Sequence, residues 1–246
     1  MNPLCAQAEA VDDKGDKKPF DGTGPYRRIA TKKGLRFTTM RCQVHLPGGE
    51  ATPDIDALPL GARKDAAHVY LGAMSKIGAP IDAGFQHSPT HDNWAPVLIG
   101  ARHGQQVRSE DPLQFQRYRS NQVVTVELEI LDDQVRCTYD GIAMDGSHQR
   151  FTATLALPGQ SWNSSGNNIS LKRTVSIAQP LGRQSFNNGS FICGVEYLET
   201  LVGRKGDLRP LEDSDIVQIQ NHPRGEGKIR LQKRSAASEL VSISLE

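Results

Sequence analysis

Two acidic residues on separate strand-like segments are the side chains of this chain best suited to acid–base chemistry. Asp82 lies within residues 81–88 and Glu196 within residues 194–199. Alternation along a β-strand turns each of them away from its apolar neighbours. If the two strands face one concave surface, the carboxylates share a cleft. Mutual repulsion and desolvation would then keep one carboxyl protonated while the other stays charged, the arrangement that acid hydrolysis needs.

Other polar and aromatic residues near these carboxylates could complete such a cleft. Gln86 is placed to steady a developing oxyanion or to bond a ligand hydroxyl. Trp94 could stack on a sugar ring, and Asn93 and Tyr197 complete the predicted ligand-binding set. Gly84 removes a side chain where a ligand could lie against the backbone. The alternative interpretation is that both carboxylates only face solvent on an open sheet.

Residues 87–92 contain a candidate metal site. His87, His91 and Asp92 are two imidazoles and a carboxylate, which is a common zinc ligand set. A spacing of four suits a helix, but Pro89 favours a loop here, so ordinary loop histidines are the preferred interpretation. We expect no metal and no cofactor.

The elements that must position these residues are short strands. Period-two alternation is clearest in residues 122–131, where Val124, Val126 and Leu128 share one face, and Asp132-Asp133 predicts a hairpin to the next strand. Similar segments are expected at residues 35–44, 68–74, 81–88, 94–102, 135–139, 151–157, 169–178, 191–202, 215–220, 228–232 and 240–245. Strands with one apolar face pack as two antiparallel sheets, so the sequence predicts an all-β sandwich of jelly-roll type.

Composition bounds the domain organisation and the partners. The chain has 246 residues, of which 37% are hydrophobic and 23% charged, values that suit one globular domain. Residues 1–30 are poor in large apolar groups and are expected to form a flexible arm before a single domain at 31–246. A net charge of +1 argues against a nucleic-acid partner, and no apolar run is long enough to span a membrane.

The cysteines and the first residues bear on the compartment. The chain has four widely spaced cysteines with no CxxC pair, at Cys5, Cys42, Cys137 and Cys193. Cys137 and Cys193 alternate with apolar residues on predicted strands, which favours both as buried small hydrophobic side chains. A disulfide at Cys42 remains open if the protein is exported. The triplet at residues 6–8, Ala-Gln-Ala, is typical of the end of a secretory signal, although the apolar stretch that should precede it is missing.

Three short motifs resemble a known group of sandwiches. Residues 82–86 read Asp-Ala-Gly-Phe-Gln, residues 93–96 read Asn-Trp-Ala-Pro, and residues 194–197 read Gly-Val-Glu-Tyr. Their order resembles concanavalin A-like lectins and glucanases, and within that group the glutamic peptidases, neprosin-like proteins and YrpD-like proteins. The resemblance implies that Asp82 and Glu196 occupy the two catalytic positions of the peptidases. Asp82 departs from the Gln or Glu of those enzymes by one methylene.

Two functions follow as hypotheses. The first is an exported, lectin-like sandwich of the secreted or cell-envelope class that binds a polysaccharide or another extended polymer on its concave face. The alternative is an acid endopeptidase that uses Asp82 and Glu196, with a polypeptide as its substrate. A polysaccharide lyase is a third and weaker option, because it would need a Tyr or His base beside a charge-neutralising cluster that the sequence does not identify.

Overall fold

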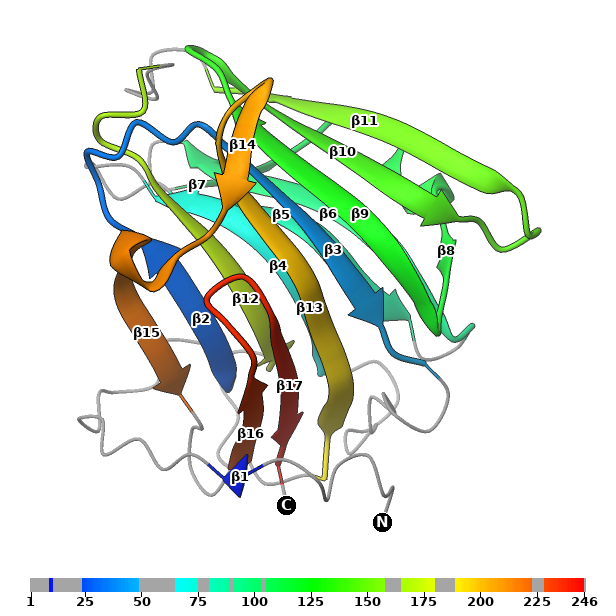
Figure 1. Ribbon diagram of the computed structural model, residues 1–246. Helices are drawn as coiled ribbons and strands as arrows, with labels where there is room; N and C mark the ends of the chain where they lie inside the picture. Colours follow the sequence, from blue (N-terminus) through cyan, green and yellow to red (C-terminus); the bar gives the residue numbers. More distant parts are fainter. Residues whose placement is uncertain are drawn as a thin grey trace.

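The computed structural model describes residues 9–10, 24–48, 65–74, 80–88, 91–102, 105–157, 165–179, 189–222 and 228–245. Most of these residues are β-strand, and they form two layered sheets (Figure 1). Short 3-10 helices at Leu113–Phe115 and Asp213–Asp215 interrupt them.

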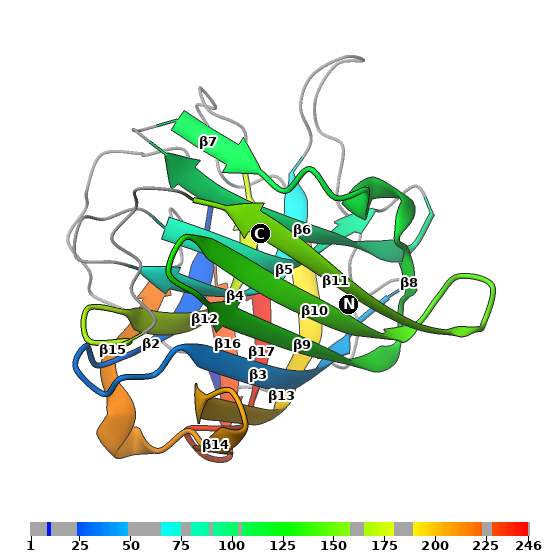
Figure 2. The same ribbon diagram turned by 90° about the horizontal axis from the view of Figure 1, so that it is seen from above.

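The larger sheet, sheet A, has nine strands. They are β1 (Glu9–Ala10), β3 (Thr39–Leu46), β9 (Gln122–Ile130), β10 (Gln134–Ile142), β11 (His148–Ala156), β13 (Phe191–Arg204), β14 (Asp207–Pro210), β16 (Lys228–Lys233) and β17 (Glu239–Ser244). Their order is β1-β16-β17-β13-β3-β9-β10-β11, and β14 pairs with β13. Figure 2 shows how far sheet A twists between β9 and β17.

The second sheet, sheet B, has eight strands. They are β2 (Tyr26–Thr31), β4 (Ala66–Met74), β5 (Pro80–Ser88), β6 (Asn93–Arg102), β7 (Gln105–Arg108), β8 (Tyr118–Arg119), β12 (Ser170–Ala178) and β15 (Ile216–His222). Their order is β15-β2-β12-β4-β5-β6-β7, and β8 pairs with β6. The predicted antiparallel β-sandwich is therefore confirmed.

Alternation explains why these segments pack as they do. In β10, Val135, Cys137 and Tyr139 are fully buried while the residues between them are half-buried. The predicted hairpin at Asp132-Asp133 joins β9 to β10, with Val135 opposite Ile130. Each strand therefore places one apolar face against the other sheet.

Aromatic side chains join the two sheets in the core. The ring of Phe85 on β5 meets those of Tyr118 and Tyr139 edge-on, at centroid distances of 5.3 and 5.4 Å. The hydroxyl of Tyr139, on sheet A, donates a 2.7 Å hydrogen bond to the carbonyl of Val97 on sheet B. The core therefore has a directional contact across the layers in addition to apolar packing.

The sequence prediction lacks β1, β2, β7, β8 and β14, and β2 is the longest of these. Residues 26–30 were assigned to the flexible arm, but Tyr26–Thr31 forms β2, which lies between β15 and β12 in sheet B. Arg27 and Ile29 are buried there. The prediction of a flexible arm is therefore wrong for residues 26–30. Residues 1–8 and 11–23 of the predicted arm, including the triplet at 6–8, lie outside the described residues.

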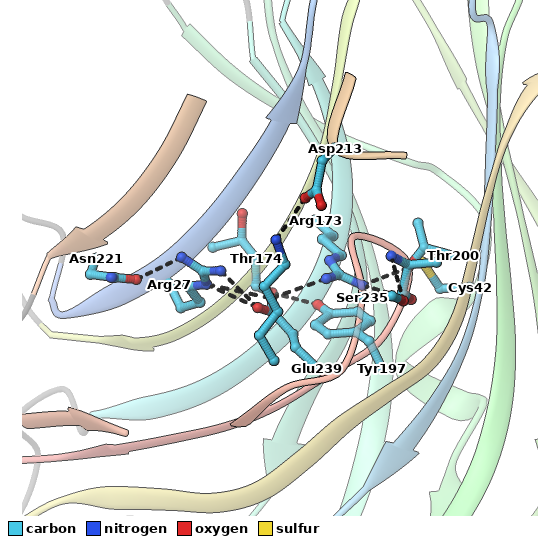
Figure 3. Close-up of polar contacts among 12 residues, drawn as sticks. Arg27, Cys42, Arg173, Thr174, Tyr197, Thr200, Asp213, Asn221, Ser235 and Glu239 are labelled. Carbon is cyan, nitrogen blue, oxygen red and sulfur yellow. Dashed lines mark hydrogen bonds and ion pairs between the residues drawn. The ribbon is translucent and has the colours of Figure 1, made fainter. Parts of the chain in front are cut away.

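Three charged side chains lie buried between the sheets. Arg27 on β2, Arg173 on β12 and Glu239 on β17 are each no more than 3% exposed. The carboxylate of Glu239 receives Arg27 Nη2 at 2.7 Å and Arg173 Nη2 at 3.2 Å (Figure 3). We call these three residues the buried charge triad.

Neutral groups add hydrogen bonds to the buried charge triad. Arg27 donates to Asn221 Oδ1 at 2.8 Å, and Arg173 Nη1 donates to Thr200 Oγ1 at 2.6 Å and to the carbonyl of Ala237 at 3.1 Å. The guanidinium of Arg173 also stacks over the ring of Tyr197, 4.6 Å from its centroid. Arg173 Nε and Nη2 form no hydrogen bond, so the charge of this arginine depends on the Glu239 carboxylate and the Tyr197 ring.

The cysteines divide into two kinds. Cys42 and Cys137 are buried free thiols, whereas Cys193 is disulfide-bonded. The expectation that Cys193 is only a small buried hydrophobe is therefore wrong, although its side chain is buried. Within the described residues there is no helix with the length and hydrophobicity of a membrane span.

Candidate functional site

The structure does not bring the two predicted catalytic carboxylates together. Asp82 lies on β5 in sheet B and Glu196 on β13 in sheet A. Both point away from the core, so they occupy the outer faces of different layers. Each has its own basic partner, since Lys172 Nζ lies 2.7 Å from Asp82 and Arg234 pairs with Glu196. The prediction that Asp82 and Glu196 share a cleft is therefore wrong. Alternation shows which face of its strand a side chain occupies, but it does not show which sheet the strand joins.

Three of the predicted ligand contacts are buried. Trp94 has no exposed surface, and its indole N–H donates to the carbonyl of Pro47 at 2.8 Å. Tyr197 is 1% exposed and its hydroxyl donates to the carbonyl of Thr174 at 3.1 Å. Asn93 is 4% exposed. The expectation that Trp94 and Tyr197 contact a ligand is wrong, because both rings are part of the core and satisfy their polar ends internally.

The histidine loop forms a pair without a metal-ligating cluster. His87 Nε2 lies 3.1 Å from Asp92 Oδ1, and the His87 ring packs 5.0 Å from that of Trp94. His91 is exposed. Within the described ranges, no three His, Cys, Asp or Glu side chains gather as a metal site would need.

The outer face of sheet B carries a different and more extended set of polar residues. Cross-strand partners in an antiparallel sheet point to the same side, so the strand register aligns side chains in rows from β15 to β5. The first row is His222, Tyr26, Ser176, His68 and Gln86; the second is Gln220, Arg28, Thr174, Tyr70 and Gly84; the third is Gln218, Ala30, Lys172, Gly72 and Asp82. Ile99 on β6 extends the third row to Arg108 on β7. We call these rows, with Arg108, the sheet B platform.

The dimensions of the sheet B platform suit a long ligand. With neighbouring strands about 4.8 Å apart, the six strands from β15 to β6 span roughly 24 Å. Successive rows are two residues apart along each strand. The platform is therefore broad enough for several units of an extended polymer.

An ion pair lies at the centre of the platform. Lys172 is 2% exposed although it points outward, and its ammonium lies 2.7 Å from Asp82 and 5.6 Å from the centroid of the Tyr70 ring. A Cβ on Gly72 would come within 2.5 Å of Lys172 Cε, so glycine is needed for the lysine side chain to lie against the sheet. Asp82 keeps 37% of its side chain exposed and can therefore meet a ligand.

Two rings on β4 flank this ion pair. His68 and Tyr70 are both partly exposed, with ring centroids 6.4 Å apart at nearly a right angle. Burial lowers the pKa of His68 to about 4, against the opposing field of Asp82. Burial and the nearby Asp82 carboxylate raise the pKa of Tyr70. At neutral pH the imidazole is thus uncharged and the phenol is protonated.

Burial likewise lowers the pKa of Lys172, with Asp82 opposing that shift. Asp82 therefore favours the charged form of the lysine, with which it makes the 2.7 Å contact. Arg28 adds a positive charge one row away, where it stacks 4.7 Å from the Tyr26 ring centroid and donates to Thr174 at 3.4 Å. The platform thus combines cations, hydroxyls, an amide and aromatic rings.

Of the predicted site residues, only Asp82 and Gln86 belong to the sheet B platform. Sequence reasoning missed His68, Tyr70 and Lys172, which flank them. A signal was present, because every second residue of Ser170–Ala178 is polar up to Ser176, and His68 and Tyr70 alternate with apolar residues. What was lacking was the pairing of β4 with β12, more than 90 residues later in the chain.

Comparisons with known proteins give only distant likenesses. No protein family matches the chain, and no curated protein matches it. Among solved structures, the enzymatically active domain of bacteriophage CBA120 tailspike protein 2 covers 78% of this chain with 11% identity and a TM-score of 0.41. This chain spans only 27% of that tailspike domain.

Two glycoside hydrolase family 16 (GH16) enzymes are also similar in fold. A Bacteroides ovatus GH16 protein of a mixed-linkage glucan locus aligns over 97% of this chain and 84% of its own, with 8% identity and a TM-score of 0.35. SCLam, a non-specific endo-β-1,3(4)-glucanase, aligns over 59% and 58%, with 13% identity and a TM-score of 0.24. No comparison supports the expected resemblance to glutamic peptidases, neprosin-like or YrpD-like proteins. Likenesses this weak carry no argument about function, which must come from the side chains.

Proposed function

We propose that the protein binds an extended polysaccharide across the sheet B platform. The observation that carries this proposal is the alignment of polar and aromatic side chains into three parallel rows on the outer face of sheet B. Within these rows Tyr26, Arg28, His68, Tyr70, Asp82 and Gln86 are partly exposed, whereas Lys172, Thr174 and Ser176 on β12 are buried. Hydroxyl-rich polymers are bound by many separate hydrogen bonds and by rings that cover their apolar faces. Tyr26 and Tyr70 supply partly exposed rings, and Gln86 and Asp82 supply partners for hydroxyl groups.

The peptidase alternative has no support in the geometry. Asp82 and Glu196 lie on different sheets, and each already pairs with a basic residue. We propose export as the setting of the protein, and the disulfide bond at Cys193 supports this, because disulfides persist in oxidising compartments.

A binding assay with paired variants tests the platform. The full chain is titrated calorimetrically with a panel of neutral and acidic polysaccharides, as wild type, Asp82→Asn and Glu196→Gln. Both substitutions remove one carboxylate charge from an outer sheet face while keeping side-chain size. Asp82→Asn should weaken the binding of neutral polysaccharides, because it removes an acceptor for hydroxyl groups, and Glu196→Gln should leave binding unchanged.

Gln86→Ala provides a second platform variant that leaves the Lys172–Asp82 pair intact. Losing one or two amide hydrogen bonds of about 1 kcal/mol each should weaken binding roughly five- to thirtyfold. Equal binding by wild type and both platform variants, or no binding to any polysaccharide of the panel, would refute the proposal.

A further inference from the structure

Charge on the sheet B platform is unbalanced in a way that points to an acidic ligand. Its charged residues are the bases Arg28, Lys172 and Arg108 and the single acid Asp82. The Asp82 carboxylate already pairs with Lys172, whose Nζ lies 2.7 Å from Asp82 Oδ1. Within the part of the chain that the structure describes, no carboxylate pairs with Arg28, whose guanidinium contacts only the Tyr26 ring, Thr174 and Tyr70.

An arginine without a carboxylate partner among the described residues is suited to binding a ligand carboxylate. Its planar fork matches the two oxygens of a carboxylate and forms charge-assisted hydrogen bonds with them. Arg28 is only partly exposed and is held in place by the Tyr26 ring, 4.7 Å away. A uronic acid unit of a polysaccharide would bring such a carboxylate to the platform.

Two groups able to transfer protons lie on β4, one of them next to Arg28. Tyr70 is its neighbour across β12 and shares a hydrogen bond with it, and His68 lies two residues from Tyr70 on the same face of β4. Gln86 and Ser176 lie on either side of His68 in its row. At neutral pH the imidazole is free to accept a proton and the phenol has one to give. The acid therefore lies next to the carboxylate-binding cation, and the base lies next to the acid, with 6.4 Å between the ring centroids of His68 and Tyr70.

We propose that the sheet B platform binds a uronic acid polysaccharide and cleaves it by β-elimination, with His68 as the general base, Tyr70 as the general acid and Arg28 on the substrate carboxylate. This inference rests on the proposed function and names the substrate class and reaction of the same site. Neither a metal nor a redox partner is required.

The step balances within the three side chains and the substrate. His68 takes the proton from C5, the carbon next to the carboxyl group, while Arg28 stabilises the negative charge that spreads onto the carboxylate oxygens. The electron pair of that C–H bond forms the C4–C5 double bond as the bond from C4 to the glycosidic oxygen breaks. Tyr70 protonates the leaving oxygen. The imidazolium and phenolate that remain return to their starting states by proton exchange with water.

The products separate this reaction from hydrolysis. Elimination leaves an unsaturated uronate at the new non-reducing end, which absorbs in the ultraviolet and is lighter by one water than the hydrolytic product. The full chain is incubated with polyuronates and with neutral glucans as controls, and products are followed by ultraviolet absorbance and mass spectrometry. We expect unsaturated oligosaccharides from a polyuronate and none from the glucans.

Variants test the assigned roles. Tyr70→Phe keeps the ring and should lower kcat at least about a hundredfold while binding changes little, because general acid–base groups contribute roughly 10²- to 10⁴-fold. His68→Asn should act in the same way, and the wild-type rate should rise with pH through the range near pH 4 in which His68 loses its proton. Circular dichroism confirms that each variant is folded, and if one is not, the other carries the test.

Each result has a defined meaning. Polyuronate binding without unsaturated product overturns the elimination and leaves the proposed function standing. Binding of neutral glycans alone overturns the acidic substrate class. Full activity in Tyr70→Phe and His68→Asn overturns the residue roles, and no binding to any polysaccharide overturns the proposed function itself.

Discussion

Glu239 is the side chain whose replacement should cost the fold most. Its carboxylate is the only acidic group of the buried charge triad and holds both guanidinium groups, at 2.7 Å for Arg27 and 3.2 Å for Arg173. Glu239→Gln keeps the size of the side chain but removes the charge. Two arginines, each no more than 3% exposed, would then lack their counter-ion.

The magnitude follows from the burial of these groups. Breaking a buried ion pair by neutralising one partner typically costs about 3–5 kcal/mol, because the remaining charge stays desolvated. A whole domain is stable by only about 5–15 kcal/mol. For a chain of this length, each kcal/mol shifts Tm by roughly 2–4 °C. We therefore expect Tm to fall by roughly 6–20 °C in Glu239→Gln.

An exposed ion pair of the same type provides the control. Lys233 Nζ lies 2.6 Å from Asp213, which is 72% exposed and is labelled in Figure 3. Asp213→Asn should cost less than about 1 kcal/mol, as exposed pairs do. Urea unfolding and thermal melts at neutral pH measure both variants. A loss in Glu239→Gln no larger than that in Asp213→Asn would refute the view that the triad carries the charge balance of the core.

Two further predictions concern titratable groups in the folded chain. Burial raises the pKa of Cys42 to about 11 and that of Cys137 to about 12. Thiol reagents at neutral pH should therefore modify neither cysteine in the native protein and both cysteines after unfolding. Rapid labelling of either cysteine in the native state would contradict this. His68 has a folded pKa near 4 against about 6.5 in unfolded chains, so the unfolded state binds more protons between these values and stability should fall as pH falls through that window. Denaturant midpoints of wild type and His68→Gln between pH 4 and 7 check this, and an equally steep loss in the variant would rule out His68 as its source.

Strand positions could be read from the sequence because alternation is local. Residues 122–131 were expected to be a strand, and Gln122–Ile130 is one, with the expected face inward. The longest strand that the sequence did not predict is β2, because Arg27 places a charged residue where the core-facing pattern would show an apolar one. Its partner Glu239 lies 212 residues further along the chain, and no local pattern marks a charge that is neutralised so far away.

The site could be read only in part. Alternation correctly turned Asp82 and Gln86 outward, and both lie on the sheet B platform. It could not show that Glu196 joins the other sheet, since that depends on which strands pair. Trp94 was expected at the surface because aromatic residues often bind sugars, but its N–H finds the Pro47 carbonyl and the ring fills the core.

The contact between Arg27 and Glu239 joins residues 212 positions apart, and this has a consequence for biosynthesis. While the chain is being made, β2 emerges with a cation that belongs in the interior, and the anion that neutralises it is synthesised 212 residues later. Until then, closing the two layers would bury an uncompensated charge, so the sandwich should stay open during translation. A nascent chain stalled before residue 239 is therefore expected to remain protease-sensitive, and the emergence of β17 would complete the charge balance of the core in one late step.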